Sequence, residues 1–306
     1  MNWNLGNAWS MLREAVVDFF DHNSPRLGAS FAFYSILSIA PLLVFTIAIG
    51  ESFLDAGEVR EYLVEEVGRA AGLDAAKAVQ TMLAKRKQAE GNLTATLLGL
   101  GTLLFGASGA FGELQAALNT IWDVRPKPNA AFWTMIRYRF LSFCLVVGTG
   151  FLMLTSMVVS TIVAAAGELM SDSWPHVEPL GHWLTMAASF VVATLLFAMI
   201  FKILPDAKIP WRDVWSGALL TSVLFTIGKW LIGLYIAKSG LSSAYGAAGS
   251  LVVLVVWIYY SAQILFFGAE LTHVYSHRRG TRVEPTDVAE KTSTPRRTPP
   301  VDVRNS

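Results

Sequence analysis

The sequence predicts an all-α, polytopic membrane protein with six transmembrane helices. Of its 306 residues, 53% are hydrophobic and only 15% are charged, and the mean hydropathy is +0.46. About a quarter of the residues in an average soluble domain are charged. The apolar residues also gather in long blocks, and about 20 apolar residues are needed for a helix to cross the hydrocarbon core. Composition and blocks together therefore indicate a membrane protein.

Six blocks are long enough to span a bilayer. They cover residues 28–50, 93–118, 139–166, 181–204, 214–237 and 246–272. None shows the period-two alternation of a barrel strand, and only helices and closed barrels satisfy their backbone groups in lipid. Each block is therefore expected to be a helix, with a kink at Pro41 in the first.

The remaining segments divide the chain into three regions. Residues 1–24 predict an amphipathic helix at the membrane surface, with the apolar stripe Leu5, Trp9, Leu12, Val16, Phe19 and Phe20. Residues 25–277 form the expected membrane domain. Within it, residues 51–92 have apolar positions at helical spacing on both sides of Gly72, which predicts a helical hairpin on the outer, periplasmic face. For both amphipathic segments, simple packing against the bundle is the alternative. Residues 278–306 are rich in Pro, Thr and Arg, so a disordered cytoplasmic tail is expected.

Lysine and arginine counts predict the orientation. Sixteen of these residues lie in the N-terminal segment, the second and fourth connections and the tail, whereas seven lie in the other connections. Cytoplasmic segments carry the excess of basic residues. Both termini are therefore expected in the cytoplasm, although Lys85, Arg86 and Lys87 lie on the opposite side.

One lysine lies inside the fifth block. Lys229 belongs to a helical face of small and polar residues, which comprises Ala218, Ser222, Thr226, Lys229 and Gly233. Such a face is typical of contacts between helices or of a cavity wall. We expect Lys229 to face the bundle interior, because an outward-snorkelling side chain would have to work against the lean of helical side chains towards their N-terminus. Snorkelling remains the alternative.

Two further polar stripes are visible. The second block carries Thr102, Gly106, Gly109, Glu113, Ala116 and Thr120, and the sixth carries Tyr259, Gln263, Phe266 and Glu270. The glycines indicate close helix contact. Both glutamates fall near the cytoplasmic end, where Arg137, Arg139 and Lys202 are the expected partners. A direct pair between Lys229 and Glu270 is not expected, since they lie at different depths.

Motifs for catalysis are missing from the sequence. It has no G-x-S-x-G, Walker A or paired-carboxylate pattern, and its single cysteine is Cys144. Glu270, His273 and His277 share one helical face, a spacing that metal ligands also use, but histidines at the end of a helix are favoured by the helix dipole in any case. We therefore expect no enzyme activity, no metal and no cofactor.

Several stretches resemble a known family. They are ASFAFYSILSIAPLL, FGELQAALNTIWDV, KILPDAKIPWRDVWSGALL, GKWLIGLY and SAYGAAGSLVVLVVWIYYSAQILFFGAEL. In this order they resemble the YihY/virulence factor BrkB family over roughly residues 25–275. The resemblance implies six spans in a bacterial inner membrane. It matches Pro41, Asn119, Trp122, Leu204-Pro205-Asp206, Lys229, Tyr245-Gly246 and Gly268-Ala269-Glu270. It implies no chemistry, and the family's older ribonuclease label lacks support in these residues.

The preferred interpretation is transport or handling of an anionic lipid, amphiphile or ion. The candidate pathway residues are Lys229, Thr226, Ser222, Gln263, Glu270 and Glu113. An intramembrane cation beside polar stripes favours an anionic ligand. A structural role that binds another envelope protein or a second copy is the alternative, and a ribonuclease is least favoured. Membrane lipids are the expected partners, and nucleic acid is not.

The topology gives the first testable prediction. Cysteines introduced into residues 51–91 or 168–180 should react with a membrane-impermeant reagent added outside the cell, because these loops face the periplasm. Cysteines in 123–135 or 281–306 should be protected. Labelling of the tail from outside would show that the orientation is wrong.

Overall fold

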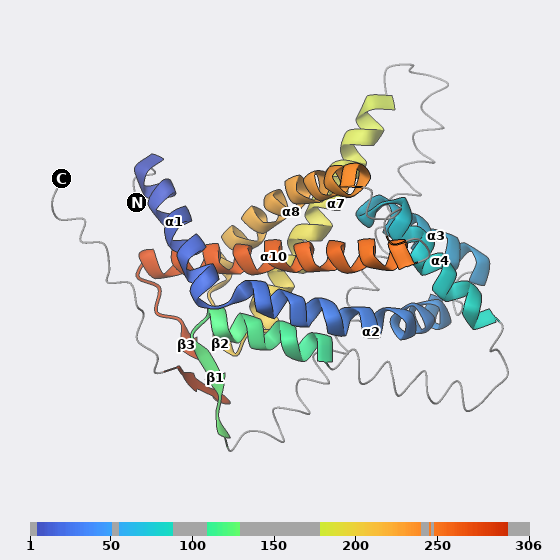
Figure 1. Ribbon diagram of the computed structural model, residues 1–306. Coiled ribbons are helices and arrows are strands. Elements are labelled where there is room, and N and C mark those ends of the chain that lie inside the picture. The colour runs from blue at the N-terminus through green and yellow to red at the C-terminus, as the bar shows by residue number, and fades with distance from the viewer. Residues whose placement is uncertain are drawn as a thin grey trace.

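The computed structural model describes residues 5–50, 55–87, 109–128, 178–239, 245 and 248–292, and these residues are mostly helical. The longest helix, α10 (Gly249–Arg278), lies between α8 (Trp211–Ser239) and α2 (Ser24–Gly50), as Figure 1 shows. α1 (Leu5–Asp21) crosses one end of α10, and α7 (Glu178–Ile203) packs on α8. α10 is therefore the axis on which the other described elements assemble.

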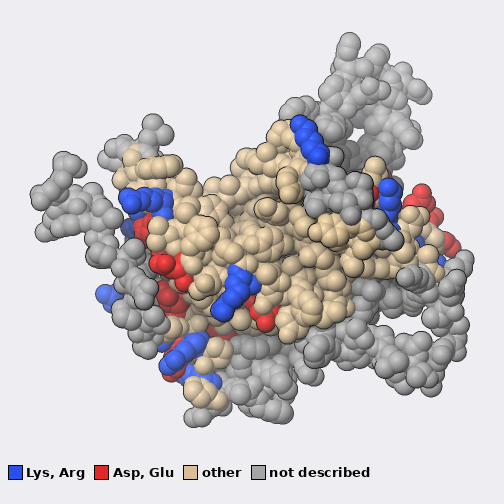
Figure 2. Space-filling model, in the orientation of Figure 1, with Lys and Arg blue, Asp and Glu red and all other residues tan. Residues whose placement is uncertain are grey.

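α8 and α10 are long and apolar enough to cross a membrane. Only 28% of the apolar stretch in α8 and 39% of that in α10 is buried, whereas the core helix of a soluble protein would be mostly buried. The exposed face of α8 is made of Leu219, Leu220, Val223, Ile227, Trp230, Leu231 and Leu234. Figure 2 shows that charged side chains gather at two ends of the molecule and are sparse between them. This surface suits a lipid environment.

The other predicted spans are only partly visible. Blocks 28–50 and 181–204 fall within α2 and α7, and residues 109–118 belong to a helix over 109–121. Residues 93–108 and 139–166 lie outside the described residues. The six-span topology therefore stays a prediction.

Glycines allow α8 and α10 to approach closely. A Cβ added to Gly268 would lie 2.1 Å from Thr221 Oγ1, and one added to Gly217 would lie 2.0 Å from Thr272 Oγ1. Each threonine hydroxyl donates to the carbonyl one turn earlier in its own helix, Thr221 to Gly217 and Thr272 to Gly268. The hydroxyls are thereby satisfied, and the two backbones meet through small residues, as is usual between helices in membranes.

Two helices occupy the segment after the first predicted span. α3 (Ala56–Ala71) begins at the N-cap Asp55, and α4 (Leu73–Lys87) follows at Gly72, whose φ of 89° favours glycine. Val59, Leu63 and Val79 form their shared apolar core. These helices lie at the end of the molecule opposite to α1 (Figure 1). Their location on the outer face of a membrane remains a prediction.

α1 is amphipathic and presents an apolar face to the surroundings. Trp9, Leu12, Val16 and Phe20 are exposed, and their spacing of three and four places them on one face. Phe19, which the sequence assigned to the same stripe, is buried instead. Ala15 packs against Leu271 and Val274 of α10. One side of α1 thus holds it on α10, and another is exposed within the described part of the chain.

The expectation of a disordered tail from residue 278 is wrong for residues 281–292. α10 continues to Arg278, and residues 281–292 form a segment that we call the strap. Within the strap, β3 (Glu284–Pro285) pairs with β2 (Ala207–Lys208), and β4 (Ala289–Lys291) pairs with β1 (Val124–Pro126). The strap has no apolar period because its strands are two and three residues long. Backbone hydrogen bonds to two turns that are far away in sequence hold it, together with the ion pairs Arg125–Glu290 and Lys208–Asp287. Residues 293–306 lie outside the described part.

The close contact of α8 with α10 generates a stability prediction. Gly268→Leu should lower the free energy of unfolding in detergent by about 1–3 kcal/mol, since the new side chain would overlap Thr221. Gly233→Leu on α8 is the matched control, because no atom lies within 4 Å of a Cβ built there. Equal stability of the two variants would contradict the close packing.

Candidate functional site

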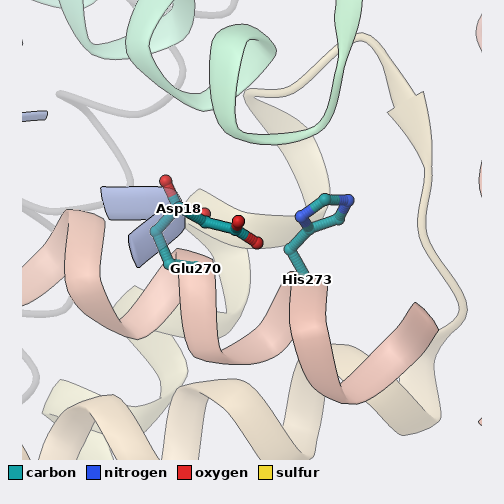
Figure 3. A group of neighbouring side chains, drawn as sticks. All are labelled: Asp18, Glu270 and His273. Atoms are coloured by element: carbon teal, nitrogen blue, oxygen red, sulfur yellow. The ribbon is translucent and has the colours of Figure 1, made fainter. Parts of the chain in front are cut away.

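A group of buried acidic and histidine side chains lies where α1 crosses α10. Asp18, Glu270 and His273 are all buried. One carboxylate oxygen of each acid and one ring nitrogen of His273 lie within 4.8 Å of one another. Figure 3 shows Glu270 and His273 on the same side of α10 with Asp18 beside them. Together with His22 and Asp123, which contact them, we call this group the acid–histidine cluster.

Local structure explains why these five residues meet. Glu270 and His273 are three positions apart on α10, so they share one helical face. Asp18 lies in the last turn of α1, and His22 occupies the turn that joins α1 to α2. Asp123 ends the helix over residues 109–121 with a φ of 51°. Asn23, directly after His22, has a φ of 54°. Asn and Asp tolerate this left-handed conformation better than other non-glycine residues.

His22 connects the carboxylates of the cluster. Its Nδ1 lies 2.7 Å from Glu270 Oε1 in a hydrogen bond, and its Nε2 lies 3.9 Å from Asp123 Oδ1. His273 Nε2 lies 3.9 Å from Asp123 Oδ2, and the Trp122 ring packs edge-on against the His273 ring. The cluster thus draws on two helices, α1 and α10, and on two turns.

Glu270 has no solvent exposure, and only one of its oxygens is bonded. Oε1 contacts His22, whereas Oε2 is buried without a hydrogen-bond partner within the described part of the chain. An unsatisfied buried polar group costs about 1–3 kcal/mol. A group left in this state calls for a physical explanation, and a bound ion is one that fits.

The environment of His22 favours its charged form. Burial by itself lowers the pKa of His22, but the hydrogen bond to Glu270 and the charges of Glu270, Asp123 and Asp18 raise it, and the net result is a pKa above the ordinary 6.5. The proton therefore binds more tightly when the cluster is assembled.

A second buried polar network lies beside the cluster. Asn119 Nδ2 and Gln115 Nε2 both donate to Asp206 Oδ2, at 2.9 and 3.2 Å, and the Asp206 backbone N–H donates to Asn119 Oδ1 at 2.8 Å. The Thr286 N–H of the strap donates to the Asp206 carbonyl. This network joins the helix over 109–121, the turn after α7 and the strap, so its role is to hold them together.

The candidate pathway residues are distributed over several places. Ser222 is buried and accepts from Thr194 of α7, whereas Thr226 is exposed. Lys229 is half-buried and shows no ion pair within the described residues. Gln263 packs on Gly28 of α2 with its amide unbonded, and Glu113 is half-buried on the helix over 109–121. Only Glu270 belongs to the acid–histidine cluster.

Lys202, one of the three partners expected for Glu270, is not paired with it. Lys202 donates to the Ile209 carbonyl and lies over the Trp211 ring, so it serves the turn between α7 and α8. Glu270 is paired with His22 instead, a residue 248 positions away that no spacing rule in the sequence singles out. Arg137 and Arg139 lie outside the described residues. His277 is exposed, whereas Glu270 and His273 are buried on the same helix.

The residues matched by the family resemblance occupy mainly packing positions. Trp122, Pro205 and Gly268 are buried, and Pro41 lies within α2. Tyr245 is exposed, and Gly246 lies outside the described residues.

An apolar groove forms a second site, which the sequence did not reveal. It lies between α2, α8 and α10 and has a volume of about 480 Å³. Its lining consists of Ala29, Ala32, Phe33, Ile36, Tyr235, Val255, Val256, Tyr259 and Tyr260. The four α2 residues recur at helical spacing and include two alanines, and this pattern is the signal that the sequence offers for the groove. Such a volume falls within the range of ligand pockets.

The exposed apolar helices, the glycine contacts and the buried polar cluster define a helical membrane protein. The model of the virulence factor BrkB family matches residues 15–293, and the chain belongs to this family. It is 26% identical over 287 residues to a UPF0761 membrane protein of Rhodospirillum centenum. The aligned region covers 91% of this chain and 60% of that relative. It is 25% identical over 273 residues to a UPF0761 membrane protein of Azotobacter vinelandii, and this alignment covers 87% of this chain and 63% of that relative. The chain thus spans about three fifths of the length of these relatives. No solved structure matches.

The raised pKa of His22 generates a pH prediction. Its contribution to stability should be fully present below the unfolded-state pKa of about 6.5 and should be lost as the pH rises through the higher folded-state pKa. The difference in melting temperature between the wild type and His22→Gln should therefore shrink as the pH rises above about 6.5. His277→Gln, at an exposed histidine, is the control. A difference that grows with pH would contradict the pairing.

Proposed function

We propose that this protein binds an anionic amphiphile and handles it within the membrane. The groove between α2, α8 and α10 is the observation that carries the proposal. Its walls are apolar, as an acyl chain requires, and three tyrosines add polar hydroxyls at its edge. Phe33, Tyr235 and Tyr260 are all well exposed, so the groove opens to the side, from which a lipid would enter.

A basic residue lies next to the groove. Lys238, in the last turn of α8, follows the groove residue Tyr235 by three positions and is therefore its neighbour on the same helical face. It is exposed, so its ammonium group is available to a phosphate or carboxylate headgroup at the end of the groove. We assign the headgroup contact to Lys238.

Lys229 is not assigned to the headgroup contact in this proposal. It does not line the groove, and it shares a face with Ser222, which contacts α7 rather than α2. If Lys229 binds the headgroup instead, Lys229→Met should remove the preference for anionic lipid, and Lys238→Met should not. A snorkelling Lys229 would leave both lipid binding and stability unchanged. The proposal includes no catalytic step.

The groove can be tested by filling it. Ala29→Phe and Val255→Phe should lower the amount of phosphatidylglycerol that remains bound in native mass spectrometry by about tenfold, because the added ring would occupy the space of the chain. Lys238→Met should retain lipid but lose the preference for phosphatidylglycerol over phosphatidylethanolamine.

Val223→Phe is the matched control, since Val223 is exposed on α8 outside the groove. Unchanged lipid retention in both groove variants would contradict the proposal. If a protein co-purifies in place of lipid, the structural, partner-binding alternative is supported.

A further inference from the structure

We infer that the acid–histidine cluster is a binding site for a divalent transition-metal ion, with Asp18, Glu270 and His273 as its ligands. The inference does not rest on the groove or on its amphiphile. The ligand set consists of two carboxylates and one imidazole, with no thiolate. Imidazole favours ions such as Zn²⁺ and Fe²⁺, and carboxylates are also compatible with Mn²⁺. The chemistry therefore selects a borderline or hard divalent cation over Cu⁺.

The geometry fits such an ion. Three atoms that lie within 4.8 Å of one another share a point no more than about 2.8 Å from each, compared with metal–ligand distances of about 2.0–2.2 Å. A shift of well under 1 Å in each side chain would complete the coordination. Glu270 and His273 come from one face of α10 at the i, i+3 spacing that helical metal proteins use for a Glu-x-x-His pair.

The unbonded oxygen of Glu270 is an independent observation. Glu270 is fully buried, Oε1 is held by His22, and Oε2 has no hydrogen-bond partner within the described residues. A hydrogen-bond network that only served packing would be expected to use both oxygens. A cation bound to Oε2 would satisfy it and would also balance the charge of the carboxylates.

The surrounding residues form a plausible support for the ligands. His22 bonds Glu270 Oε1 and so orients the carboxylate, and Asp123 lies near both histidines. Partners of this kind fix ligand geometry in known metal sites, and their loss typically costs 10–100-fold in metal affinity. The N–H of Thr292 donates to the Asp123 carbonyl at 2.8 Å, so the strap holds the Asp123 turn in place.

The test uses the full-length chain, purified without a histidine tag, treated with EDTA and dialysed against Zn²⁺ or Mn²⁺. Elemental analysis should find one equivalent of at least one of the two ions, and binding should raise the melting temperature. Asp18→Asn, Glu270→Gln and His273→Gln should each weaken binding by at least about tenfold, and His22→Gln by a similar factor. X-ray absorption of the Zn²⁺ form should show nitrogen and oxygen ligands only.

His277→Gln is the control, because His277 is exposed one turn after His273 on the same helix. It should bind as the wild type does. Metal binding that is lost in His277→Gln but retained in Asp18→Asn would identify a surface site and overturn the inference. The inference would also be overturned if neither Zn²⁺ nor Mn²⁺ bound at one equivalent. If Glu270→Gln fails to fold, Asp18→Asn and His273→Gln decide the question.

Discussion

A carboxylate without solvent exposure needs partners inside the protein, and the burial of Glu270 constrains much of the described structure. His22 supplies one partner, and because His22 lies in the turn between α1 and α2, this hydrogen bond fixes where both helices meet α10. Asp123 then links the same histidine to the helix over 109–121, and the strap bonds to the Asp123 turn. One buried acidic side chain therefore ties together segments from both ends of the chain.

α10 also makes a close contact with α8 and lines the groove. Close contact with α8 depends on Gly268 and Gly217, which face the side chains of Thr221 and Thr272 rather than charged groups. Beyond that region the helices part enough to leave the groove between α2, α8 and α10. The acid–histidine cluster and the tight contact with α8 thus share residues 268–273 of α10, whereas the groove lies against residues 255–260. The charged chemistry and the apolar binding surface therefore occupy different segments of one helix.

The sequence predicted the features that depend on local composition. Long apolar runs gave the helical membrane class, the periodicity of residues 5–20 gave α1, and the family was recognised from its motifs. It could not predict the pair of His22 with Glu270, because a contact across 248 positions leaves no periodic signal. The order of the strap was missed for a related reason: its strands are stabilised by backbone groups and ion pairs of turns that are about 80 to 165 positions away in the sequence. The groove depends on how far apart helices lie, which periodicity does not encode.

The most direct test of this account is a double-mutant cycle on His22 and Glu270. The free energy of unfolding in detergent is measured for the wild type, His22→Gln, Glu270→Gln and the double variant. If the hydrogen bond joins the α1–α2 turn to α10, the coupling energy should be at least about 1 kcal/mol. Effects that add to within about 0.3–0.5 kcal/mol would show that the two residues act independently, and the account would be wrong.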